Sequence, residues 1–148
     1  MKTKGTNVSV NESIVARVSF EKVANHACFL PVSDGEWCVR LNDILLVDRI
    51  KAVGHLVAGD IVVIHNNGLI RTLYRRDSNT NSLFLTERCN SNCLMCSQPP
   101  MDWDDIPKYI SINSELIRLI PNDCRELGMT GGEPTLLGEG LIDLVAGM

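Results

Sequence analysis

Three cysteines lie close together in the second half of the chain, at Cys89, Cys93 and Cys96. Cysteine thiolates are the usual ligands of iron–sulfur clusters, and they also bind zinc. The close spacing keeps the entropy cost of closing the loop around a metal centre small. Three thiolates can hold three irons of a [4Fe–4S] cluster and leave the fourth iron open. The spacing therefore predicts a cluster with one coordination position for an outside ligand.

Zinc and unbound thiols are the alternative interpretations of these cysteines. A structural zinc site is usually closed by four protein ligands. The one cysteine downstream, Cys124, is distant in sequence, and the histidines His26, His55 and His65 all precede the cluster. Unbound core thiols are not expected on a polar Asn-Ser-Asn loop. The iron–sulfur interpretation is therefore favoured.

A glycine-rich turn follows the cysteines, formed by Thr130, Gly131, Gly132, Glu133 and Pro134. Glycine permits unusual backbone dihedral angles and exposes backbone carbonyls. Those carbonyls and the Glu133 carboxylate can accept hydrogen bonds from an ammonium group, and Pro134 would stiffen the turn. A plain strand-to-helix turn is the alternative for this motif taken alone.

Composition narrows the class of protein. The 148 residues are 45% hydrophobic and 22% charged, which predicts a globular fold, and the net charge of −4 without a basic run argues against a nucleic-acid partner. Because no signal peptide or membrane-length apolar segment is visible, we expect a cytoplasmic location with reduced thiols and no membrane partner. Cys28 and Cys38 are then read as small buried hydrophobic residues, with an auxiliary cluster as the alternative.

Residues 1–80 are predicted to form a β-rich region. Asn67-Gly68 is a strong hairpin signal between two apolar runs. A polar segment at residues 75–81 is interpreted as a linker, so the domain boundary is placed after residue 80. The segment at 43–48 fits either a strand or a helix. Strands are expected at 14–20, 37–41, 57–64 and 69–74.

Residues 81–148 alternate between strand and helix patterns. A short apolar strand at 82–86 leads into the cysteines, and helices are expected at 111–120 and from residue 136. A second strand is expected just before the glycine turn. Such alternation predicts a parallel sheet of βα units and an α/β fold. Two parallel strands cannot bury both faces of a sheet, so we expect the chain to be truncated.

The order of the two motifs, each after a strand, resembles the radical S-adenosylmethionine (radical SAM) superfamily. This resemblance implies a β-rich N-terminal region followed, over residues 81–148, by the first two βα units of a partial (βα)6 barrel. It also implies that Cys89, Cys93 and Cys96 bind a [4Fe–4S] cluster whose open iron binds S-adenosylmethionine. Cleavage of that molecule then gives a 5′-deoxyadenosyl radical.

The resemblance assigns the cofactor-binding residues as well. Thr130, Gly131, Gly132, Glu133 and Pro134 would hold the methionyl group of S-adenosylmethionine. Met95 would lie near its adenine, at a position where the family more often has an aromatic residue. A thioether can also pack on a ring. No catalytic side chain is assigned, and the chain alone is not expected to be a competent enzyme.

Residues 86–100 and 130–138 are similar to one subgroup, the C-type radical SAM maturases of the His-Xaa-Ser peptide-modification system. This similarity implies a ribosomally made peptide substrate, a second radical SAM maturase as partner, and a reductant such as flavodoxin or ferredoxin. A non-catalytic iron–sulfur electron-transfer module and a structural zinc protein are the alternative functions.

Overall fold

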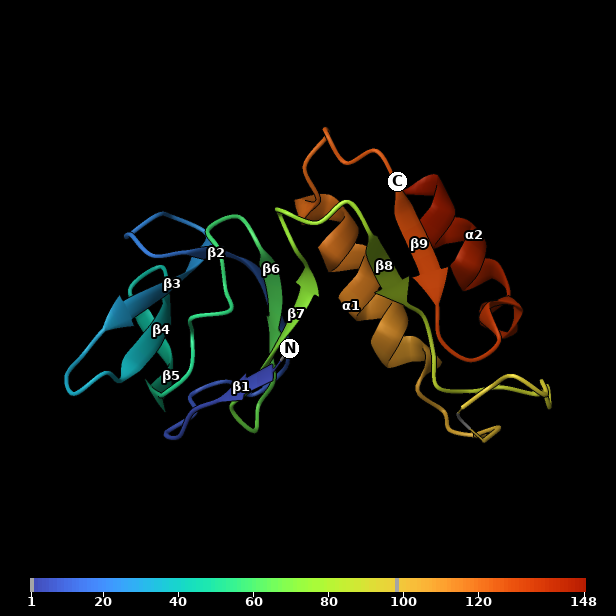
Figure 1. The fold of residues 1–148 in the computed structure, drawn as a ribbon, viewed down its shortest axis with the longest axis horizontal. Coiled ribbons are helices and arrows are strands. Elements are labelled where there is room, and N and C mark those ends of the chain that lie inside the picture. The colour runs from blue at the N-terminus through green and yellow to red at the C-terminus, as the bar shows by residue number, and fades with distance from the viewer. Residues whose placement is uncertain (1, 98) are drawn as a thin grey trace. The chain divides into compact units, whose positions relative to one another are not determined.

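The computed structural model describes residues 2–97 and 99–148 of the chain (Figure 1). The chain divides into two compact units, Met1–Ser78 and Asn79–Met148. Each unit has its own hydrogen-bonded sheet.

The first unit is built around a mixed sheet, which has seven strands within the described residues. Its spatial order is β1-β7-β6-β2-β3-β4-β5. Neighbouring strands are antiparallel except β2 and β3, which pair in parallel between Arg17–Ser19 and His26–Cys28. The strands are β1 (Lys2–Lys4), β2 (Ile14–Ser19), β3 (His26–Pro31), β4 (Trp37–Leu41), β5 (Ile44–Ile50), β6 (Ile61–Ile64) and β7 (Leu69–Tyr74).

The β6–β7 hairpin confirms the prediction made from Asn67-Gly68. Gly68 has φ of +78°, which the glycine tolerates without strain, and its N–H donates to the carbonyl of His65 at 2.9 Å. The N–H of His65 in turn donates to Leu69 O at 2.8 Å. All four residues of β6 are buried, and Val62 and Ile64 belong to the hydrophobic core of the unit. The ambiguous segment at 43–48 is part of strand β5.

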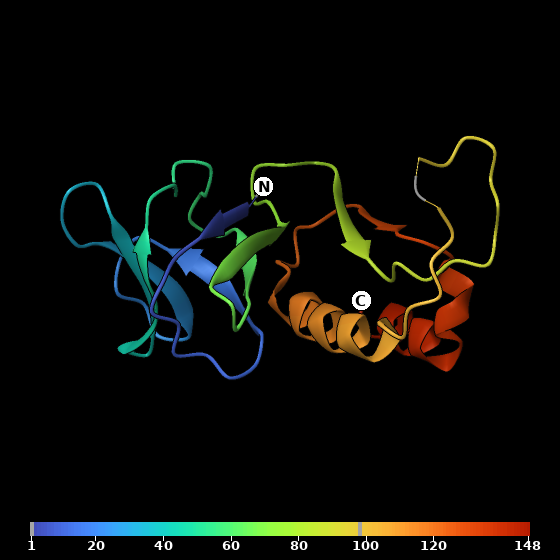
Figure 2. The ribbon, with the colours of Figure 1, turned by 90° about the horizontal axis from the view of Figure 1, so that it is seen from below.

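The second unit contains a parallel pair of strands, β8 (Asn81–Phe84) and β9 (Leu127–Thr130). Helices α1 (Ile106–Leu119) and α2 (Glu139–Ala146) lie on one face of this pair (Figure 2). Asn113 fixes α1 against β8, because its buried side-chain amide donates to Phe84 O at 2.9 Å. A short 3-10 helix, η1 (Pro134–Leu137), precedes α2.

The start of α1 differs from the prediction. The helix begins at Ile106 rather than near Ser111, because Pro107 sits in the first turn, where its missing N–H leaves no hydrogen bond unmade. It ends at Leu119, and Ile120 is extended, as expected for a residue that precedes a proline. In the part of the chain that the structure describes, no helix is long and apolar enough to cross a membrane.

The predicted fold class is wrong. Most strands of the described residues belong to the mixed, mainly antiparallel sheet of the first unit, and the same residues hold two α-helices, so the chain is not a radical SAM type of βα barrel. Closing a barrel requires many tilted strands in one continuous sheet. The β8–β9 sheet has two strands, and its helices cover one face. The alternation of strands and helices over residues 81–148 therefore builds a two-stranded parallel sheet and no barrel.

Phe29 tests the core of the first unit, because it is fully buried and packs beside Phe20 at 6.2 Å between ring centroids. We expect Phe29→Ala to lower the free energy of unfolding of this unit by about 3–5 kcal/mol. Val32→Ala, at a side chain that is 57% exposed, should change it by less than about 0.5 kcal/mol. Urea unfolding followed by Trp37 fluorescence in a Trp103→Phe background measures both. Equal effects would contradict the assigned core.

Candidate functional site

The cysteine loop, residues 89–101, begins shortly after β8 and is held together at its neck. The N–H of Cys89 donates to Met101 O at 2.9 Å, and Arg88 forms a parallel bridge with Met101. The Arg88 guanidinium also contacts the Asp102 carboxylate at 2.8 Å. The two ends of the loop are therefore held together by contacts that do not involve the residues between them.

Two of the three predicted thiol ligands share a cavity in this loop. The Cys96 N–H donates to Cys93 O at 3.1 Å, which forms a tight turn. Cys93 and Cys96 are exposed, whereas Cys89 is half-buried and its thiol donates to Ser91 O at 3.7 Å. The cavity measures about 240 Å³ and is lined by Ser91, Asn92, Cys93, Cys96, Ser97, Pro99 and Pro100.

The donor types fit an iron–sulfur cluster, but their positions do not yet converge. Within residues 2–97 and 99–148, no group of three or more His, Cys, Asp or Glu side chains is close enough to hold a metal ion. The loop between the ligands is solvent-exposed, with Leu94 fully exposed and Met95 95% exposed. Such a segment can rearrange at little packing cost. Cluster binding therefore requires the exposed segment that carries Cys93 and Cys96 to move toward Cys89, which is held at the neck of the loop.

The glycine turn lies directly beside the entrance to the cysteine loop. Leu85 N donates to Thr130 O at 2.9 Å, which continues the β8–β9 ladder. Gly132 N then donates to Thr86 O at 2.7 Å, and Glu133 N donates to Arg88 O at 2.9 Å. These backbone bonds bring together two motifs that are far apart in sequence.

Both glycines of the turn are required by this close approach. Gly131 has φ of +134°, and a Cβ atom there would lie 2.5 Å from Thr86 O. A Cβ atom on Gly132 would overlap the carbonyl group of Arg88. Any larger residue would push the turn away from the strand end. The close backbone packing therefore explains why both positions are glycine, without any ligand.

Glu133 presents an ordered carboxylate at the turn. Its Oε1 accepts hydrogen bonds from the hydroxyl of Thr135 at 2.7 Å and from Thr135 N at 3.1 Å. These bonds, the hydroxyl first and the backbone N–H second, lower the pKa of Glu133. Pro134 follows as the first residue of η1. Glu133 is therefore ionised at neutral pH and held in one orientation.

Sequence reasoning missed two residues that join the motifs, Thr86 and Asp105. The Thr86 hydroxyl is fully buried, donates to Asp105 Oδ1 at 2.5 Å and accepts from Arg88 N at 2.9 Å. The other Asp105 oxygen accepts from Glu87 N at 2.7 Å. The available sequence signal was a threonine at the end of the apolar strand expected at 82–86, because a hydroxyl that is buried there needs hydrogen-bond partners. Asp105 gave no signal that set it apart from its acidic neighbours.

Comparison with known proteins gives no assignment. The chain matches no protein-family model, no curated protein and no solved structure. The case for a site therefore rests on the geometry of this chain. That geometry places Cys93 beside Cys96, and the turn from Thr130 to Pro134 beside the loop entrance. It leaves Cys89 outside the shared cavity and Met95 in solvent.

A methyl group at Gly132 tests the contact between the turn and the strand end. We expect Gly132→Ala to destabilise the second unit by about 1–3 kcal/mol, because the new Cβ overlaps backbone that cannot move aside easily. Gly147→Ala is the matched control, since its Cβ would meet neighbours at 3.5 Å or more, an ordinary contact distance. Thermal unfolding and amide exchange of Glu133 measure the effect. A Gly132→Ala chain with unchanged Glu133 protection would contradict the pairing.

A double-mutant cycle tests the Thr86–Asp105 link. Thr86→Val and Asp105→Ala should each cost about 1–3 kcal/mol, because each leaves a partly buried polar group without its partner. The double variant should cost less than the sum, by about 1 kcal/mol or more. Asp104→Ala, at an exposed neighbour, should show no coupling to Thr86→Val. Additive effects for Asp105 would show that the hydrogen bond contributes little.

Proposed function

We propose that the cysteine loop and the glycine turn together bind a [4Fe–4S] cluster and S-adenosylmethionine. The observation that carries this proposal is the backbone pairing of Gly132 with Thr86 and of Glu133 with Arg88. That pairing sets a potential ammonium-binding turn beside three cysteines with cluster-binding spacing. A reduced cluster would supply the electron that breaks the C5′–S bond of S-adenosylmethionine, giving methionine and a 5′-deoxyadenosyl radical.

The residues of the chain would divide the binding between them. Cys89, Cys93 and Cys96 would hold three irons as thiolates. Glu133 would accept a hydrogen bond from the methionyl ammonium. Both hydrogen bonds that its carboxylate accepts from Thr135 reach Oε1, so among the described residues Oε2 is available for a ligand. The ionised state of Glu133 suits a cationic partner, since charge-assisted hydrogen bonds are the stronger ones.

The exposed tip of the cysteine loop would complete the site. Met95 is 95% exposed and has a flexible thioether that can pack on the adenine ring. Movement of this tip over the ligand would also exclude water from a reactive radical. The hydrogen atom that the radical abstracts would come from a peptide substrate. A flavodoxin or ferredoxin would supply the electron, and a second radical SAM maturase would act alongside this chain.

Anaerobic reconstitution with iron and sulfide tests the cluster. The full chain should take up about four irons and gain broad visible absorbance. Cys89→Ala, Cys93→Ala and Cys96→Ala should each lose most of the bound iron. Cys124→Ala is the matched control, because Cys124 lies outside the cysteine loop, and it should load normally. Stoichiometric zinc with no iron uptake would instead establish the zinc alternative.

Addition of S-adenosylmethionine to the reduced, loaded chain tests the second ligand. Its binding should change the electron paramagnetic resonance spectrum of the cluster, and Glu133→Gln should weaken that binding about tenfold by removing the charge. Glu139→Gln, at an exposed glutamate on α2, should bind as the wild type does. If the spectrum of the loaded cluster does not change when S-adenosylmethionine is added, the chain is instead an electron-transfer module.

A further inference from the structure

A second cavity lies in the first unit and shares no residue with the cysteine loop or the glycine turn. It has a volume of about 320 Å³ and opens between the loop after β2, the strands β3 and β4, and the β4–β5 turn. This volume is at the lower end of the range for small-molecule sites. Its lining residues are Lys22, Val23, Ala24, Cys28, Leu30, Arg40, Asn42 and Asp43.

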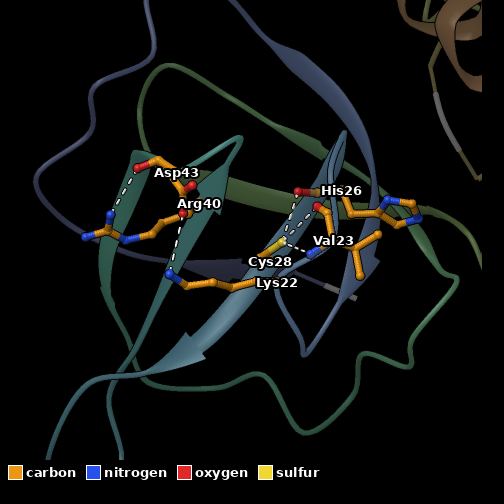
Figure 3. Close-up of polar contacts among 6 residues, drawn as sticks. All are labelled: Lys22, Val23, His26, Cys28, Arg40 and Asp43. Atoms are coloured by element: carbon orange, nitrogen blue, oxygen red, sulfur yellow. Dashed lines mark hydrogen bonds and ion pairs between the residues drawn. The ribbon is translucent and has the colours of Figure 1, made fainter.

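The walls of this cavity are fixed by hydrogen bonds. Asn25 and Asn42 join the loop to the β4–β5 turn, because Asn42 Oδ1 accepts from Asn25 N at 2.8 Å and its amide nitrogen donates to Asn25 Oδ1 at 3.1 Å. The buried thiol of Cys28 lies 3.4 Å from Val23 O and 3.3 Å from His26 O, and it accepts from Val23 N at 3.4 Å (Figure 3). The cavity is therefore largely preformed.

The charged groups of the lining leave one net positive charge. Asp43 lies 3.6 Å from the Lys22 ammonium, and its backbone carbonyl accepts from Arg40 Nη1 at 3.0 Å (Figure 3). This is the one hydrogen bond of the Arg40 side chain within the described residues, and a guanidinium carries five N–H donors. The Lys22–Asp43 pair is largely exposed and therefore weak, so Lys22 can turn toward a ligand.

We propose that this cavity binds a small organic monoanion, a carboxylate attached to a short apolar chain. Arg40 would hold the carboxylate through its planar pair of N–H donors, and Lys22 would add a second cation. Val23, Ala24 and Leu30 would contact the apolar chain, with the Cys28 sulfur as part of the wall. The site lies within the first unit and does not depend on the proposed cluster.

The same lining argues against other ligands. A dianion such as phosphate would carry one negative charge more than the net positive charge of the lining can balance, and a neutral alcohol would leave that positive charge without a counter-charge. An organic cation would be repelled by the positive charges of Lys22 and Arg40. The Cys28 sulfur already has hydrogen-bonding neighbours, and no metal-binding group includes it among the described residues. A monoanion is therefore the ligand class with the best charge match.

Hexanoate is a suitable probe, compared with hexan-1-ol and inorganic phosphate. We expect saturable binding of hexanoate to the full chain with a Kd of about 1 mM or tighter, a range suited to so small a ligand. Binding is followed by amide resonance shifts at residues 22–30 and 40–43. Arg40→Gln should weaken it about tenfold or more, and Lys22→Gln should weaken it less. Arg49→Gln and Lys51→Gln, at exposed positions on another part of the unit, are the matched controls.

Several results would overturn the proposal. These are no saturable binding of hexanoate, equal or tighter binding of hexan-1-ol or phosphate, or an Arg49→Gln effect as large as that of Arg40→Gln. The amide spectrum of each variant away from the cavity shows whether it has folded. If Arg40→Gln does not fold, Lys22→Gln decides the matter, because its exposed side chain is not needed for the sheet. Binding unchanged in that variant would then count against the site.

Discussion

The structure of the second unit depends on the continuation of the β8–β9 backbone ladder beyond the ends of both strands. Thr86 O accepts from Gly132 N, and Arg88 O accepts from Glu133 N. Buried backbone groups need partners, so this pairing is strongly favoured once β8 and β9 lie in register. It determines how closely the glycine turn approaches the cysteine loop. The proposed role of Glu133 as a ligand-binding residue depends on this close approach of the turn to the loop.

The pairing of the motifs could be predicted from sequence, whereas the atoms that enforce it could not. Strand patterns before Cys89 and before Thr130 are enough to expect neighbouring strand ends, because parallel strands place their carboxyl ends at one edge. The steric demand on Gly131 and Gly132 depends on the carbonyls of Thr86 and Arg88, which no local pattern reveals. The Thr86–Asp105 bond likewise joins residues whose contact arises only after the loop closes at its neck.

Prediction of the fold succeeded where local chemistry dominates. The Asn67-Gly68 turn and the β-branched run of β6 specify a hairpin by themselves. Strand β3 was missed, because His26 and Pro31 bound it and its parallel pairing with β2 is a tertiary effect. The barrel prediction failed for a related reason. Alternating strands and helices indicate βα units, but sheet size depends on long-range pairing that a local pattern does not contain.

The geometry of the cysteine loop suggests why its thiols need not converge in the folded chain. Three thiolates brought close together without a metal would repel one another, so a preformed arrangement would be costly. The neck formed by Cys89, Met101 and the Arg88–Asp102 pair shortens the segment that must be ordered. Most of the entropy cost of closing the loop is therefore met when the chain folds. Ligand binding then has to order only the remaining exposed residues. The ends of the loop are held by the fold, whereas the tip is exposed. The fold can therefore be stable before an iron–sulfur cluster is bound.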